Sequence, residues 1–137
     1  MGELTTVPLS ISTFCMRSFL LVGTGGFLGA IARYYTYSLI RYFTFSSFPY
    51  TTMIVNVLGC FLGGLLMSLV EKTYPNHRML IEFGMVGVLG GFTTYSTFGY
   101  ETFKLIQNNQ LQAAILNIVC SAVFGVIAVW IGFSIFK

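Results

Sequence analysis

The chain has 137 residues and a net charge of +3, and 55% of its residues are hydrophobic while only 8% carry a charge. Soluble domains carry charges on roughly a quarter of their residues. The composition therefore excludes a soluble globular domain and indicates an integral membrane protein, and no basic patch with interleaved aromatic residues predicts a nucleic-acid partner.

Four stretches are long and apolar enough to cross a lipid bilayer, which takes about 20 residues of helix. They cover about 17–39, 51–70, 79–103 and 111–136, so the whole chain, 1–137, is expected to form one four-helix transmembrane domain. The N-terminal tail lacks a cleavable leader pattern, and we expect the first stretch to remain in the mature protein. The predicted fold class is an all-α membrane protein.

The first stretch contains four glycines and then turns polar and aromatic. Arg33 is followed by a cluster of tyrosines of the kind found at a membrane interface. In one interpretation Arg33 attracts anions near a pore entrance, and in the other its side chain extends to the lipid headgroups.

The second stretch contains Asn56 one helical turn after Thr52, then Gly59 and Gly63 at a spacing that lets helices approach closely. An asparagine surrounded by hydrocarbon needs partners. Asn56 either bonds a neighbouring helix or lines the path of an ion.

The third stretch holds the least membrane-like part of the sequence, the run from Gly90 to Phe98. Glycines weaken a helix, and hydrocarbon offers no water to the backbone groups that a break would free. Gly90 and Gly91 beside Thr93 and Thr94 therefore predict a third helix that is broken near its centre. A cation bound by the freed carbonyl oxygens is one way to satisfy them, and a kink satisfied by packing is the other.

Beyond the glycines, residues three or four apart share a helix face. Tyr95 and Phe98 then form an aromatic face, and Thr93, Ser96 and Thr97 form a neighbouring stripe of hydroxyls. Hydroxyl hydrogens and the positive edge of an aromatic ring both suit a small anion. Packing of the rings as ordinary core is the plainer alternative.

The fourth stretch carries two polar positions, Asn117 and Ser121. Ser121, like Asn56, either bonds a neighbouring helix or lines an ion path. No acidic residue lies at mid-membrane in any stretch, because Glu82 and Glu101 fall near the two ends of the third. This pattern disfavours a proton-coupled pump.

The seven basic residues are nearly balanced between the two sides of the membrane. Three fall on one side and four on the other: Arg33, Arg41 and Lys104 against Arg17, Lys72, Arg78 and Lys137. Orientation normally follows an excess of basic residues on the cytoplasmic side. The balance predicts insertion in both orientations or, alternatively, ordinary weak polarity.

No catalytic set is visible in the sequence. His77 is the only histidine and falls in a polar loop from Glu71 to Arg78, where we expect a solvated side chain. The three cysteines show neither a metal-ligand spacing nor a disulfide pattern, and we expect inert packing for Cys15, Cys60 and Cys120. The sequence predicts a protein that is not an enzyme.

Several segments together resemble one family. They are Thr52 to Gly59, Gly87 to Phe98 followed by Glu101 and Thr102, and Gly29, Ala30 and Arg33 in the first stretch. The sequence is similar to the Fluc (CrcB) fluoride channels over all four stretches in order. The resemblance implies a passive fluoride channel made of two antiparallel subunits of dual topology, with two separate pores through the dimer.

The resemblance also implies roles for individual residues. The anion path would be lined by Asn56, Tyr95, Ser96, Thr97, Phe98 and Ser121, and the candidate pore entrance by Arg33, Thr52 and Glu101. A structural sodium ion at the centre of the dimer would be held by the backbone carbonyls of Gly90 and Thr93. In the plainer interpretation Glu101 simply pairs with a cation.

Three positions depart from the family pattern. The first of two pore phenylalanines is Tyr95, whose hydroxyl is expected to narrow or rewire the path, and two hydroxyl positions of the fourth stretch are Gly125 and Val129. The thinner polar track predicts either a path that runs differently or a chain that works with a paralogous partner in a heterodimer. A homodimer is the favoured arrangement.

The resemblance thus implies a channel of the plasma membrane that exports cytoplasmic fluoride down its electrochemical gradient and confers fluoride resistance. Fluoride, the lipid bilayer and a second subunit are the expected partners. A proton-coupled exporter of the small multidrug-resistance type is one alternative, although it predicts an acidic residue in the first stretch, which has none. A membrane scaffold subunit without transport activity is the other.

Overall fold

The computed structural model describes residues 9–44, 46, 48–73 and 78–137, with side chains from residue 16 onward. Every secondary-structure element in these ranges is a helix. The predictions made for the N-terminal tail, for the side chain of Cys15 and for His77 lie outside the described residues.

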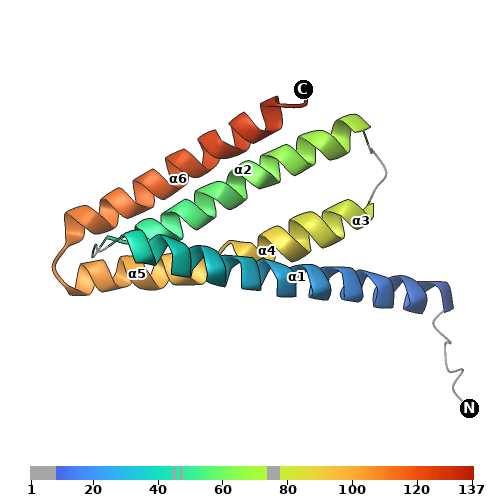
Figure 1. Ribbon diagram of the computed structural model, residues 1–137, viewed down its shortest axis with the longest axis horizontal. Helices are drawn as coiled ribbons and strands as arrows, with labels where there is room; N and C mark the ends of the chain where they lie inside the picture. Colours follow the sequence, from blue (N-terminus) through green and yellow to red (C-terminus); the bar gives the residue numbers. More distant parts are fainter. Residues whose placement is uncertain (1–8, 45, 47, 74–77) are drawn as a thin grey trace, which may run out of the picture.

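Four rods lie side by side and alternate in direction, so that the start of the first and the end of the last are at the same end of the molecule (Figure 1). The first two rods are α1 (Leu9–Phe43) and α2 (Tyr50–Thr73), and the last is α6 (Leu111–Ser134). The third rod consists of α3 (Arg78–Leu80), the π-helix η1 (Ile81–Leu89), α4 (Gly90–Phe92) and α5 (Tyr95–Gln107).

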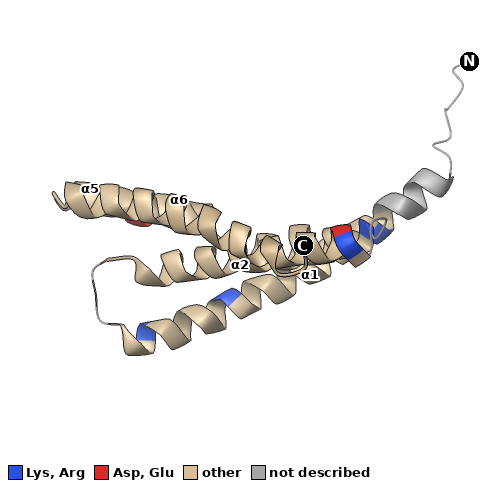
Figure 2. Cartoon of the chain, turned by 90° about the horizontal axis from the view of Figure 1, so that it is seen from above, with Lys and Arg blue, Asp and Glu red and all other residues tan. Residues whose placement is uncertain are grey.

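Two of the helices, α2 and α6, are long and apolar enough to cross a membrane. Each has 24 residues, and no Lys, Arg, Asp or Glu lies in its long middle stretch (Figure 2). The third rod is divided into two shorter pieces, and α1 carries four glycines between Arg17 and Arg33. The structure thus supports a helical membrane protein with two clear apolar spans.

The rods pack as two pairs, with α1 along η1 and α4, and α2 along α6. Glycines allow both close contacts. A Cβ atom at Gly29 would overlap the carbonyl oxygen of Val88, and one at Gly132 would overlap that of Phe61. Because a backbone atom cannot move aside as a flexible side chain can, these two helix–helix contacts require glycine.

The glycines of α2 behave differently from each other. A Cβ at Gly59 would overlap the methyl group of Thr93, whereas one at Gly63 would make ordinary contact with Met85 at 3.6 Å. The predicted close approach is therefore confirmed at Gly59, which brings α2 against the interruption of the third rod.

The third helix is broken near its centre, as the sequence predicts, but not at the glycines. Gly90 and Gly91 are helical, and the extended residues are Thr93 (φ −76°, ψ 157°) and Thr94 (φ −147°, ψ 109°). The break falls at the threonines because Thr94 caps the next helix: its hydroxyl accepts a hydrogen bond from the Thr97 N–H at 3.2 Å.

One loop prediction is wrong in its extent. The sequence suggests a polar loop from Glu71 to Arg78, whereas α2 continues through Thr73 and α3 begins at Arg78. Arg78 and Glu82 form an ion pair four residues apart at 2.7 Å, and Glu82 also accepts a bond from Ser18 of α1. These contacts favour continued helix where polarity alone suggests a loop.

Candidate functional site

The break in the third rod is held by Asn56 of α2. The Asn56 amide Nδ2 donates to the Thr94 carbonyl oxygen at 3.1 Å, and the Thr94 N–H donates to Asn56 Oδ1 at 2.8 Å. The side chain thus replaces helical bonds that the extended residues have lost. Since an amide nitrogen carries two hydrogens, Asn56 keeps one for another partner.

The hydroxyl groups around the break do not form the predicted stripe. Thr93 is extended, and its hydroxyl donates back to the Leu89 carbonyl oxygen at 2.9 Å. The centre of the cluster is instead Thr94, whose Oγ1 lies 3.2 Å from Ser96 Oγ and 2.9 Å from Thr97 Oγ1. This role of Thr94 was not predicted, although threonine is a preferred N-cap residue at the start of a helix.

A cavity of about 440 Å³ lies between α2, α5 and α6, and none of its eight lining residues carries a charge. We name it the neutral cavity; it is lined by Asn56, Cys60, Thr93, Tyr95, Phe98, Ile118, Ser121 and Ala122. It brings together four of the six residues predicted for the anion path.

The two aromatic rings of the neutral cavity stand next to each other, as the sequence predicts. The ring centroids of Tyr95 and Phe98 are 5.6 Å apart, with the planes tilted by 38°. Tyr95 is 84% exposed on the isolated chain, so its ring is not part of a closed core. On the opposite wall, Ser121 Oγ is buried without a hydrogen-bond partner in the described part of the chain.

Cys60 is a free, half-buried thiol that lines the neutral cavity, and its expected inert packing stays a prediction. It also stands beside one of the departures from the family pattern, because a Cβ at Gly125 would lie 3.5 Å from its Sγ. The other departure, Val129, lines a separate groove that includes Gly90. Tertiary neighbours of this kind leave no local pattern in the sequence.

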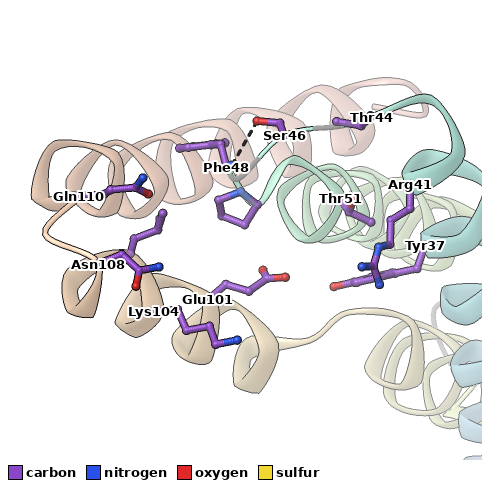
Figure 3. Close-up of a pocket in the computed structure, with 12 residues that line it drawn as sticks. Tyr37, Arg41, Thr44, Ser46, Phe48, Thr51, Glu101, Lys104, Asn108 and Gln110 are labelled. Carbon is purple, nitrogen blue, oxygen red and sulfur yellow. Dashed lines mark hydrogen bonds between the residues drawn. The ribbon is translucent and has the colours of Figure 1, made fainter.

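Two further cavities lie on the other side of α5, towards α1. We name the larger, of about 420 Å³, the end cavity; its lining includes Tyr37, Arg41, Glu101, Lys104 and Asn108 (Figure 3). The smaller, of about 390 Å³, is the side cavity, lined by Ala30, Arg33, Tyr34, Tyr37, Ser38, Arg41 and Thr97. Unlike the neutral cavity, both contain charged side chains.

The three residues predicted for a pore entrance lie around these two cavities. Thr52 is only 1% exposed, and its Oγ1 lies 2.7 Å from the hydroxyl oxygen of Tyr37. Glu101 extends into the end cavity, and its Oε2 is buried with no partner among the described residues. Arg33 lines the side cavity and donates from its guanidinium to the Thr93 carbonyl oxygen at 3.4 Å. The link between the cavities, Tyr37, was not predicted.

The predicted anion path is divided between the two sides of α5. Phe98 and Tyr95 face the neutral cavity, whereas Thr97 faces the side cavity with Arg33. Ser96 is exposed beside the break. In a single chain the predicted residues therefore do not line one common cavity.

A buried polar pair fixes α6 to the turn that carries Phe98. The Asn117 amide donates to Thr102 Oγ1 at 2.8 Å, and the Thr102 hydroxyl donates to the Phe98 carbonyl oxygen at 2.7 Å. Both side chains are buried. Asn117 is thus a helix-to-helix contact rather than a cavity residue.

Metal ligands were predicted only as backbone carbonyls, and the described residues hold no group of three His, Cys, Asp or Glu side chains suited to a metal. At Gly90 the geometry fits a carbonyl ligand, because the Thr94 N–H that would bond this oxygen in a continuous helix donates to Asn56 instead. The Thr93 carbonyl accepts one long bond from Arg33 and retains a second lone pair.

Comparison with known proteins gives one consistent result. The sequence profile of the family described as CrcB-like protein, Camphor Resistance (CrcB), matches residues 20–133. A "Fluoride-specific ion channel FluC" from Ruminiclostridium cellulolyticum is 43% identical over 117 residues, which are 85% of this chain and 90% of the relative. Relatives from Campylobacter lari (42% identical; 86% and 96% covered) and Methanosarcina acetivorans ("FluC 1", 39%; 85% and 88%) have corresponding names. The chain therefore belongs to the CrcB family.

Proposed function

We propose that the chain is a subunit of a passive, fluoride-selective channel that releases cytoplasmic fluoride across the plasma membrane, and that it is not an enzyme. The relatives, each named a fluoride-specific ion channel, carry this proposal. Hydrogen fluoride crosses lipid uncharged and ionises inside the cell, so the anion accumulates there. An inside-negative potential then favours its exit by about 2.3 kcal/mol per charge per 100 mV, without another energy source.

The chemistry of the neutral cavity supports an anion path. A small anion that leaves water needs replacement hydrogen-bond donors. Asn56 keeps one amide hydrogen, Ser121 has an unpartnered hydroxyl, and the rings of Tyr95 and Phe98 offer positive edges. Because these groups are neutral, they attract an anion less strongly than an arginine does, which allows the ion to leave again.

We propose that two antiparallel chains form a dimer with two such paths. Each chain presents path residues on both sides of α5, and the ring of Tyr95, 84% exposed, is open to contact with a second chain. A second, inverted chain would cover both sides by the same contacts. A homodimer is the simplest arrangement, and a paralogous partner is the alternative.

In this arrangement each chain crosses the membrane four times, through α1, α2, the interrupted third rod and α6. The start of α1 and the end of α6 lie at the same end of the molecule, so four crossings would bring them to one side of the bilayer (Figure 1). The near balance of basic residues between the two sides supports insertion in both orientations.

The carbonyl oxygens of Gly90 and Thr93 are proposed to hold a structural sodium ion. One chain offers too few oxygens to surround a cation, so a second chain would supply the remainder at the dimer centre. The bound ion would neutralise the carbonyl dipoles at the break and join the two chains. Purified dimer is expected to dissociate or melt at a lower temperature when sodium is replaced by N-methylglucamine, and equal melting in both cations would contradict the site.

Flux from liposomes tests the function directly. Vesicles that contain the purified chain and potassium fluoride should release fluoride when a potassium ionophore supplies the counter-current, and matched potassium chloride vesicles should retain chloride. Release that requires a proton gradient would indicate the exporter alternative. No release, with the chain alone or with a paralogous chain, would indicate the scaffold alternative.

A further inference from the structure

One tyrosine connects the two charged cavities. Tyr37 of α1 lines both the end cavity and the side cavity, which otherwise share only Arg41. The ring is half-buried, unlike that of Tyr35, which is 68% exposed. Tyr37 therefore forms the wall at which the two cavities meet.

The neighbours of Tyr37 on α1 are cationic. Arg33 precedes it by four residues and Arg41 follows it by four, so the three side chains lie on one face of the helix. All three line the side cavity, opposite Thr97 of α5. An anion attracted by the two guanidinium groups meets the phenol between them.

The phenol is held in place by a buried partner on α2. Its hydroxyl oxygen lies 2.7 Å from Thr52 Oγ1, and Thr52 is 1% exposed. Two hydroxyls that share one hydrogen bond use one of their two hydrogens, so the pair retains one hydrogen, and the Glu101 carboxylate lies close enough to Thr52 to compete for it. In Figure 3 the hydroxyl of Tyr37, the guanidinium of Arg41 and the carboxylate of Glu101 point towards one another across the end cavity.

We infer that Tyr37 is a further residue of the anion path, and that the Tyr37–Thr52 hydroxyl pair donates a hydrogen bond to fluoride where the ion passes between the end cavity and the side cavity. Thr52 acts as a positioning residue for the phenol. The inference rests on the proposed function, because it assigns a donor to the same ion.

The test removes single hydroxyls and measures fluoride release from liposomes. Tyr37→Phe keeps the ring and loses only the donor, and its release rate is expected to fall about fivefold, the effect of one ordinary hydrogen bond. Tyr35→Phe is the matched control, since the same change two residues away touches neither cavity. Its rate should equal that of the unchanged chain.

A double substitution separates a shared hydrogen-bonding unit from two structural effects. Thr52→Val should slow fluoride release as much as Tyr37→Phe does, whereas Thr52→Ser, which keeps the hydroxyl, should release fluoride at the full rate. The double variant with Tyr37→Phe and Thr52→Val should be no slower than the slower single variant. Elution volume and melting temperature identify any variant that does not fold. If Thr52→Val does not fold, the release rates of Thr52→Ser and Tyr37→Phe are compared instead.

Two results would overturn the inference. Release by Tyr37→Phe at the full rate would show that the phenol donates nothing to the ion, and effects that multiply in the double variant would show that the two hydroxyls act independently. Failure of the unchanged chain to release fluoride would instead contradict the proposed function, and this inference with it, so the two failures are distinguishable.

Discussion

The neutral cavity and the two cavities beside α1 receive side chains from the same helix, α5, yet they differ in charge. Phe98 contributes to a chamber with no charged lining residue, while Thr97, the preceding residue, faces a chamber that contains Arg33 and Arg41. One helix thus separates a surface of mixed charge, with more basic than acidic side chains, from a neutral surface that carries hydrogen-bond donors.

The difference suggests a division of labour along the ion's route. Long-range attraction by arginines raises the local anion concentration but would trap an ion that bound them directly. Neutral donors and ring edges stabilise an anion more weakly and only at short range. The substitutions below are expected to affect one side of α5 without the other.

The largest effect is expected from Asn56→Leu. The substitution leaves the Thr94 N–H and carbonyl unpaired, and an unsatisfied buried polar group costs about 1–3 kcal/mol. The break should lose its fixed geometry, so we expect a lower melting temperature in detergent and no fluoride release from liposomes. Melting and flux are measured on the same preparation.

Gln107→Leu is the control for this change, because Gln107 is exposed at the end of α5, away from the break, and lines none of the three cavities. Its melting temperature should be unchanged. A fully stable Asn56→Leu variant would show that the Thr94 backbone finds other partners, and that Asn56 does not hold the break.

Phe98→Ile should have the next largest effect. An aliphatic side chain of similar bulk keeps the packing but removes the positive ring edge that faces the neutral cavity. Fluoride release is expected to slow by about tenfold, which corresponds to about 1.4 kcal/mol in the barrier. Unaltered release from an intact dimer would remove Phe98 from the path.

How much of this site the sequence predicts depends on the range of the contacts. The aromatic pair Tyr95 and Phe98 and the broken helix follow from local spacing and from glycines and hydroxyls in an apolar stretch, and the structure contains both. The exact place of the break follows only in part, because the Thr94 cap is local whereas the Thr94 backbone also bonds Asn56, which lies 38 residues earlier. A local pattern cannot contain such a partner.

The cavity that a residue lines is equally invisible in the sequence. Thr97 and Phe98 are adjacent, and only the packing of α1 on one side and α6 on the other assigns them to different chambers. Tyr37 was missed for the same reason, since its tyrosine cluster suggests a membrane interface. The four-residue spacing of Arg33, Tyr37 and Arg41 was the available signal.

On the charged side, Arg41→Gln should have a smaller effect that depends on salt. Loss of one positive charge from the end cavity should slow release about twofold at low ionic strength. Because the Debye length shortens to about 3 Å in 1 M salt, the difference should disappear with an impermeant salt at that concentration. Flux is measured across this range of salt.

Lys72→Gln, which removes a charge from the exposed end of α2, serves as its control and should show neither effect. The tenfold slowing by Phe98→Ile should be the same at all salt concentrations. An Arg41→Gln effect that is independent of salt would contradict an electrostatic role, and with it the proposed contrast between the two sides of α5.

The smallest effect is expected from Tyr95→Phe, at the position where the family resemblance predicts a phenylalanine. The substitution keeps the ring 5.6 Å from Phe98 and removes a hydroxyl for which the described residues provide no hydrogen bond. If the ring edge is what the ion meets, release should change by less than about twofold, since no established bond is lost. A rate that rises well above this limit would show that the Tyr95 hydroxyl narrows the path, and a rate that falls as far as that of Phe98→Ile would show that it donates to the ion. Only the second result would move Tyr95 from the purely aromatic wall to the hydrogen-bonding part of the neutral cavity.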